Sequence, residues 1–130
     1  MRVDYFEPLF RLLLARNIDE CAQSATRILE TRARLSEVDR KLLSIFTELR
    51  RYFYNHNPDQ DELNRLRDFF KRNGSMEGML LTTWQIAYQC DLIGESSLAS
   101  EYWTECLKYS ACLDEKYLSA TYAGLARNCI

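Results

Sequence analysis

Residues 80–113 read LLTTWQIAYQCDLIGESSLASEYWTECLKYSACL, and this stretch decides the fold of the chain. Apolar residues recur at helical spacing on both sides of Gly94, and glycine ends helices because it adopts left-handed backbone angles without a steric penalty. Ala87 and Ala99 place a small side chain on each side, where two helices can approach closely. Trp103, one turn after Ala99, would fill the space beside that contact. The stretch therefore predicts two antiparallel helices packed as a hairpin.

This hairpin resembles a tetratricopeptide repeat, a helical pair that stacks on further copies of itself. Ala87 and Ala99 match the small positions of the family pattern, Gly94 matches the turn, and Trp103 matches the large position of the second helix. Trp84 lies one place after the tryptophan position of the pattern, and the closing proline is absent. The resemblance is therefore to a degenerate repeat, and it covers about a quarter of the chain.

Helical periodicity extends over the rest of the chain and predicts an all-α fold. Start signals occur at Asn17, Ser36, Ser75 and Asp114, where a short polar side chain can cap a helix. Two prolines and four glycines supply few of the turns that an all-β chain needs. The predicted helices, about seven in number, cover residues 6–16, 17–34, 36–55, 58–73, 75–93, 96–110 and 114–127.

We predict that the helices pair as antiparallel hairpins and stack as a short TPR-like α-solenoid within one helical-repeat domain, residues 1–130. The connections are short, as antiparallel neighbours require. Asn17 and Ala22 repeat the five-residue offset of Gly94 and Ala99, which suggests a second related pair. The last helix is predicted to cap the stack. An unrelated helical bundle is the alternative.

Composition is that of an ordinary globular protein, with 47% hydrophobic and 28% charged residues. The net charge of -2 supplies no basic field that would attract nucleic acid. No apolar run approaches the roughly 18 residues that span a membrane, so we expect a cytoplasmic protein. Residues 76–130 carry three Lys or Arg and seven Asp or Glu, an imbalance that favours a protein-facing surface.

The cysteines are odd in number, form no C-x-x-C pair, and have a single histidine, His56, to join them. A disulfide framework or a zinc site is therefore disfavoured. We predict reduced thiols that act as small core residues. The five are Cys21, Cys90, Cys106, Cys112 and Cys129.

Residue patterns do not predict catalysis, and we expect neither an enzyme nor any catalytic, cofactor-binding or metal-binding residue. His56 stands in a polar Asn-His-Asn-Pro segment that is typical of a solvated loop. Neither a nucleophile elbow nor a phosphate-binding or dinucleotide-binding loop occurs. Asp59, Asp61 and Glu62 cluster at a predicted helix start, where they complement the helix dipole, and no EF-hand spacing follows them.

The family resemblance implies a binding surface, because the first helices of tetratricopeptide repeats line a groove that holds peptides or helices. Leu81, Trp84 and Tyr88 match groove positions on the first helix of the hairpin, and Leu118 with Tyr122 match them on the next. Exposed rings make good anchors because they bury much area with few rotatable bonds. The same cluster would equally suit a packed core or a dimer interface, and these alternatives stay open.

The leading hypothesis is a non-enzymatic adaptor or chaperone that binds a segment of another protein in this groove. By analogy of fold alone, the chain is similar to small bacterial secretion chaperones and regulators. A homodimeric scaffold or regulator is the second hypothesis. A nucleic-acid-binding regulator is the third and is disfavoured, because acidic residues interleave with the ridge of cations that would include Arg50 and Arg51.

Overall fold

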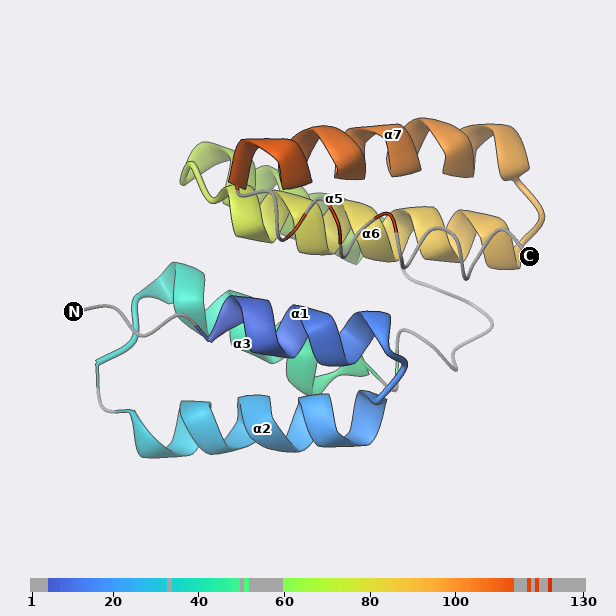
Figure 1. The fold of residues 1–130 in the computed structure, drawn as a ribbon. Coiled ribbons are helices and arrows are strands. Elements are labelled where there is room, and N and C mark those ends of the chain that lie inside the picture. Colours follow the sequence, from blue (N-terminus) through green and yellow to red (C-terminus); the bar gives the residue numbers. More distant parts are fainter. Residues whose placement is uncertain are drawn as a thin grey trace. The chain divides into compact units, whose positions relative to one another are not determined.

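The structure is a computed structural model that describes residues 5–32, 34–49, 51, 60–113, 117, 119 and 122. Within these residues every element of regular structure is an α-helix, which confirms the predicted all-α class (Figure 1). The helices are α1 (Phe6–Leu14), α2 (Ile18–Thr31), α3 (Glu37–Thr47), α5 (Gln60–Arg72), α6 (Met76–Leu92) and α7 (Ser96–Leu113). The predicted helix start at Asn57 and Pro58 and most of the predicted capping helix lie outside the described residues, so the count of seven stays a prediction.

The chain divides into two compact units, which are Met1–Asn55 and His56–Ile130. The first unit contains α1, α2 and α3, and the second contains α5, α6 and α7. In each unit the middle helix packs against both of its sequence neighbours. The predicted pairing of consecutive helices is thus present within each unit, whereas the single domain and the solenoid stacking stay predictions.

Aromatic rings form the core of the first unit. Phe6 and Phe10, one turn apart on α1, stack with their centroids 5.4 Å apart, and the ring of Phe46 on α3 meets Phe6 edge-on at 5.8 Å. All three side chains are at most 1% exposed. Ring pairs in these geometries contribute about 0.5–1.5 kcal/mol beyond the burial of their area. The apolar face of α1 therefore lies in the core, where Phe6 contacts α3.

Two turns in the second unit have the geometry of a Schellman motif, in which the residue after the helix adopts left-handed angles. Gly74 follows α5 with φ 66°, and Gly94 follows α6 with φ 84°. After α6 the N–H of Glu95 donates to the carbonyl of Cys90 at 2.9 Å, and the turn after α5 makes an equivalent bond. The prediction that Gly94 forms the turn of the hairpin is confirmed.

The turn between α1 and α2 repeats this geometry with an arginine in place of the glycine. Arg16 has φ 63°, and the N–H of Asn17 donates to the carbonyl of Leu12 at 2.9 Å. A residue with a Cβ in left-handed angles costs about 1–2 kcal/mol. The first unit therefore stores backbone strain at this turn.

Arg16 occupies the left-handed turn position that Gly94 occupies in the later hairpin. Asn17 was predicted at that position, so the register predicted for this pair is wrong by one residue. The small residue five places further on is Cys21, which is fully buried, and not Ala22, which is half-buried. The thiol of Cys21 donates to the carbonyl of Leu9 on α1 at 3.3 Å. A side chain no larger than cysteine is needed where α2 crosses α1 this closely.

Two of the predicted helix starts are confirmed in detail. The hydroxyl oxygen of Ser36 accepts a hydrogen bond from the backbone of Asp39 at 3.0 Å, and Ser75 caps α6 in the same way at 3.1 Å. Asn17 precedes α2 as expected, but its side chain does not cap the helix. Its amide donates instead to the carboxylate of Glu20 at 2.6 Å, which is a contact between two side chains that leaves the backbone N–H groups of the first turn uncapped by Asn17.

One predicted helix end is wrong. A break was expected at 110–113, yet α7 continues to Leu113. The hydroxyl of Ser110 is buried and donates to the carbonyl of Cys106 at 2.8 Å, so this serine is satisfied inside the helix and does not interrupt it. α3 ends at Thr47, but Leu49 and Arg51 are again helical, and the end expected near residue 55 lies outside the described residues.

The α6–α7 hairpin has the packing predicted from its sequence. Ala87 and Ala99 are fully buried, as is Cys106, and Trp103 is 7% exposed. The indole N–H of Trp103 donates to the carboxylate of Asp91 at 2.8 Å, which ties the start of α7 to the end of α6. The two helices lie side by side along their length (Figure 1).

α5 and α6 approach each other closely at Gly78. A Cβ at this position would overlap the ring atoms of Phe70, which is itself fully buried. One turn before Phe70 on α5, the guanidinium of Arg67 forms an ion pair with Glu105 of α7 and lies 5.7 Å from the ring centroid of Tyr102. α5 is thus joined to α6 by close packing and to α7 by a charged contact.

Candidate functional site

The groove predicted on the first helix of the hairpin is not an open surface at Leu81 and Trp84. Both side chains are 0% exposed. The indole of Trp84 stacks on Tyr88 with centroids 5.6 Å apart and meets Trp103 of α7 edge-on at 5.5 Å. The aromatic cluster is therefore core packing between α6 and α7 at this point, and the expectation that these two residues line an exposed groove is corrected.

The other predicted groove residues differ in exposure. Tyr88 is half-buried beneath its stacking contact with Trp84. Tyr122 is 56% exposed, and Leu118 lies outside the described residues. Of the four predicted residues that the structure describes, only Tyr122 presents an exposed ring.

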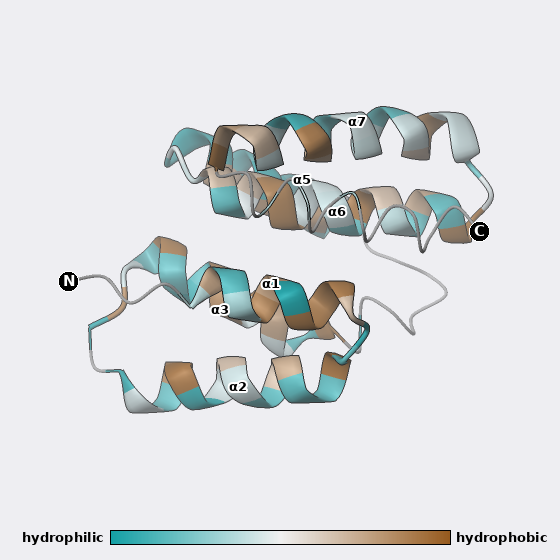
Figure 2. Ribbon diagram, in the orientation of Figure 1, coloured by the Kyte–Doolittle hydropathy of each residue, from teal (hydrophilic) through white to brown (hydrophobic). Residues whose placement is uncertain are grey.

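A different group of apolar side chains is exposed where α6 turns into α7. Leu92 is 55% exposed, Ile93 49% and Leu98 37%, and together these three residues form what we call the hairpin tip. Figure 2 shows hydrophobic colouring at this end of α6. Single exposed aliphatic residues are ordinary on protein surfaces, but three within seven consecutive residues of one turn form a candidate contact.

The hairpin tip is held in one conformation by contacts on both sides of it. The left-handed Gly94 closes the turn, and Glu95 donates its backbone N–H to α6. Asp91 accepts the hydrogen bond of the Trp103 indole, and Ala99 is buried against α6 one turn into α7. Preorganisation of this kind lowers the conformational entropy lost on binding.

Acidic residues surround the hairpin tip, and the stretch of sequence that forms it contains no Lys or Arg. Asp91 and Glu95 are exposed at the turn, and Glu101 is exposed one turn along α7 from Leu98. Burial is the largest cause of the raised pKa of the Cys90 thiol. The nearby carboxylates of Glu95 and Asp91 raise this pKa further. The sequence between Arg72 and Lys108 contains five acidic residues and no Lys or Arg. The tip is therefore an apolar contact in a negative field.

Sequence reasoning missed the hairpin tip for a physical reason. Twelve of the seventeen residues of α6 are buried, so apolar residues occur on every side of this helix and periodicity cannot separate a core face from an exposed one. A usable signal was the Leu92–Ile93 pair directly before Gly94. Apolar residues at a helix end lack the following turn that would cover them.

The thiols of the described residues are reduced, and three of the four are core residues as predicted. Cys21, Cys90 and Cys106 are buried and free. Burial raises the pKa of Cys21 to about 12 and also raises the pKa of Cys106, so neither is a nucleophile near neutral pH. Cys112 is exposed, which corrects the prediction for that residue, and Cys129 lies outside the described residues.

α6 also carries buried amide groups. Gln85 is 0% exposed and Gln89 1%, and they lie one turn apart. Within the part of the chain that the structure describes, neither side-chain amide has a hydrogen-bond partner. An unsatisfied buried polar group costs about 1–3 kcal/mol. These glutamines therefore weaken the second unit.

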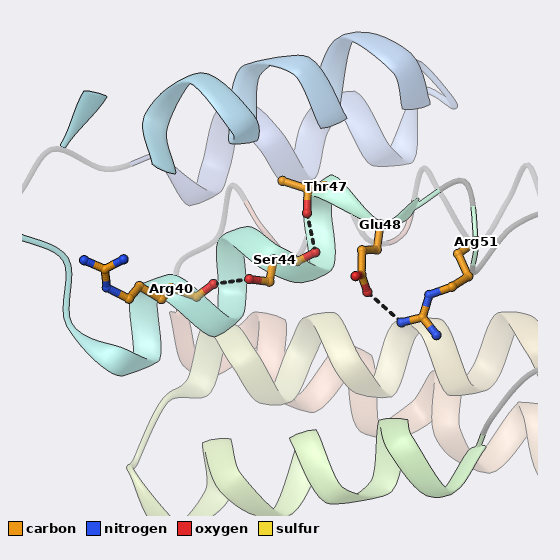
Figure 3. A network of polar contacts seen from close by, with 5 residues as sticks. All are labelled: Arg40, Ser44, Thr47, Glu48 and Arg51. Carbon is orange, nitrogen blue, oxygen red and sulfur yellow. Dashed lines mark hydrogen bonds and ion pairs between the residues drawn. The ribbon is translucent and has the colours of Figure 1, made fainter. Parts of the chain in front are cut away.

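The cations proposed for a basic ridge are largely engaged or mixed with acids. Arg51 pairs with Glu48 at 2.6 Å beyond the end of α3. Figure 3 shows this pair and, within α3, the hydroxyls of Ser44 and Thr47 that donate to backbone carbonyls. Arg50 lies outside the described residues. On α5, Arg65, Lys71 and Arg72 share an open hollow with Asp68. This distribution gives no unbroken positive stripe of the kind that follows a phosphate backbone.

The described residues contain neither a metal-binding cluster nor a membrane-spanning helix. Among them, no three His, Cys, Asp or Glu side chains are grouped so that they could hold a metal ion. Nor does any helix in that part of the chain have the length and apolar character to cross a bilayer. His56, the single histidine, lies outside the described residues.

No family model matches the chain, and no curated protein or solved structure matches it either. The resemblance to the tetratricopeptide family therefore stays a prediction that rests on the residues of one hairpin.

Proposed function

We propose that this chain is a non-enzymatic protein–protein interaction module, an adaptor or chaperone, that binds a segment of another polypeptide at the hairpin tip. The observation that carries the proposal is the exposure of Leu92, Ile93 and Leu98 together on a turn held by hydrogen bonds. Burying a fully exposed aliphatic side chain contributes about 1.5–3 kcal/mol, so three that are roughly half exposed would supply about 3 kcal/mol. That is a gain in affinity of about a hundredfold.

The hairpin on which the tip stands supports the proposed tetratricopeptide-like architecture. Its turn glycine has the left-handed angles that the family pattern needs, and the small residues Ala87 and Ala99 are both buried. The binding surface that we propose differs from the concave groove that the resemblance implied. It uses the end of the hairpin, because Leu81 and Trp84 are buried.

The homodimer hypothesis is less well supported at this surface. Two copies pairing through their tips would bring Asp91 and Glu95 of one copy against the same residues of the other, and like charges in contact disfavour binding. Light scattering on dilution separates the two functions: a dimer that persists at low concentration favours self-association through another surface, such as the exposed Tyr122.

Comparative co-purification tests the proposal. The double variant Leu92→Ser/Ile93→Ser removes the two most exposed side chains of the hairpin tip, and Met76→Ser is a matched control because Met76 is 36% exposed at the opposite end of α6. Circular dichroism and thermal melting first establish that both variants fold. We expect the unmodified chain and the control to retain partner proteins that the double variant loses. Equal retention by all three proteins would reject the hairpin tip as the binding surface.

A further inference from the structure

We propose that the segment bound at the hairpin tip is basic and amphipathic, with apolar side chains flanked by Lys or Arg. This inference rests on the proposed function and specifies the chemistry of the partner. It follows from the combination of two features at one turn: three exposed aliphatic residues, and exposed carboxylates with no cation beside them in the sequence.

The apolar part of the contact comes from the three residues of the hairpin tip. Leu92 and Ile93 directly precede the turn, and Leu98 lies in the first turn of α7, so the three are presented by both helices of the hairpin. A partner that covers them must itself offer apolar side chains, because polar groups placed there would lose water without gaining hydrogen bonds.

The charged part of the contact comes from three carboxylates. Asp91 and Glu95 lie on either side of the turn, and Glu101 follows Leu98 by three residues, which places it on the same side of α7. None of these three is joined to a Lys or Arg by an ion pair among the described residues, whereas Glu105 further along α7 is paired with Arg67. The acids at the tip are thus available to a cationic partner.

This arrangement favours a polypeptide over the two common anionic partners. A nucleic acid or an anionic lipid surface would approach Asp91, Glu95 and Glu101 with charge of the same sign. A peptide with alternating basic and apolar residues satisfies both the aliphatic and the acidic groups at once. Basic amphipathic helices are a recurring partner class for apolar surfaces with acidic rims.

Fluorescence anisotropy with designed peptides tests the inference. The probe is a labelled helical peptide of about 18 residues, five turns, with leucine on one face and lysine on the other. Its twin carries glutamate in place of every lysine. The full chain is titrated into each peptide at about 50 and about 300 mM salt, a range over which screening of exposed charges increases strongly.

The lysine peptide should bind, the glutamate peptide should not, and binding should weaken at the higher salt. Leu92→Ser/Ile93→Ser should weaken binding of the lysine peptide by about 10-fold or more. Glu95→Gln/Glu101→Gln should weaken it about 5-fold. The control variants Met76→Ser and Glu30→Gln, which change an exposed apolar and an exposed acidic residue elsewhere, should leave affinity unchanged.

Failure of this inference and failure of the proposed function are distinguishable. Equal binding of both peptides, or loss of affinity in the apolar variant but not in the acidic variant, would overturn the basic partner while leaving an apolar binding tip. No binding of the lysine peptide at about 1 mM, the weak end of measurable affinity, would also overturn it. The proposed function itself falls only if co-purified proteins are the same for the Leu92→Ser/Ile93→Ser variant and the unmodified chain.

Discussion

Replacement of Gly78 by alanine tests the close packing of α5 on α6. Alanine is a better helix former than glycine by up to about 1 kcal/mol, so propensity alone predicts a stabilised protein. The structure predicts the opposite, because the added Cβ would overlap the ring of Phe70. That ring is fully buried and cannot move into solvent. Overpacking costs about 1–3 kcal/mol, and an overlap with several ring atoms belongs at the upper end. The net expectation is a destabilisation of about 2 kcal/mol.

Urea unfolding followed by tryptophan fluorescence measures this change, since Trp84 and Trp103 both belong to the second unit. A double-mutant cycle isolates the contact. In a Phe70→Leu background the smaller side chain leaves room, so Gly78→Ala should become neutral or stabilising by up to about 1 kcal/mol. A stabilised Gly78→Ala protein in the unmodified background would refute the proposed close approach of the two helices.

The structure also predicts whether three further substitutions raise or lower the stability of the protein. Arg16→Gly relieves left-handed strain at the first turn, so unfolding should require about 1 kcal/mol more free energy; a destabilised variant would contradict the φ of 63°. Gln85→Met replaces a buried amide without a described partner, so we expect the melting temperature to rise by an amount equivalent to about 1–2 kcal/mol of unfolding free energy. A fall in melting temperature would mean that the amide forms hydrogen bonds in the folded protein. The pKa of Cys21 is raised by burial to about 12, so the unfolded chain releases this proton first and stability falls as pH rises above about 9. Between pH 9 and 10, Cys21→Ala should therefore lose less stability than the unmodified chain by about 1 kcal/mol, and equal losses would contradict the buried thiol.

Local turn chemistry explains which parts of the fold the sequence could predict. Gly94, Ser36 and Ser75 act through groups within a few residues of themselves, and their roles were predicted correctly. The turn at Arg16 has the same hydrogen bonds as the one at Gly94, but arginine gives no signal for left-handed angles. The register of the first pair was therefore misplaced by one residue.

Contacts between elements explain what the sequence could not predict. Whether Trp84 is core or surface depends on what packs over α6, and this helix has apolar residues on every side. The contact of Gly78 with Phe70 joins two helices through a residue that, by itself, only lowers helix propensity. Ser110 looked like a helix end and is instead satisfied by its own helix. The candidate binding surface moved from a groove to the hairpin tip for the same reason: exposure is a property of the packed structure.

Nuclear magnetic resonance on the labelled chain, titrated with the leucine–lysine peptide, tests the binding surface most directly. Amide chemical-shift changes should centre on residues 91–98 and extend along α7 to Glu101, with little change in the first unit. Saturable shifts centred on any other part of the chain would contradict a binding surface at Leu92, Ile93 and Leu98, whereas no shifts at peptide concentrations of about 1 mM would overturn the basic partner alone.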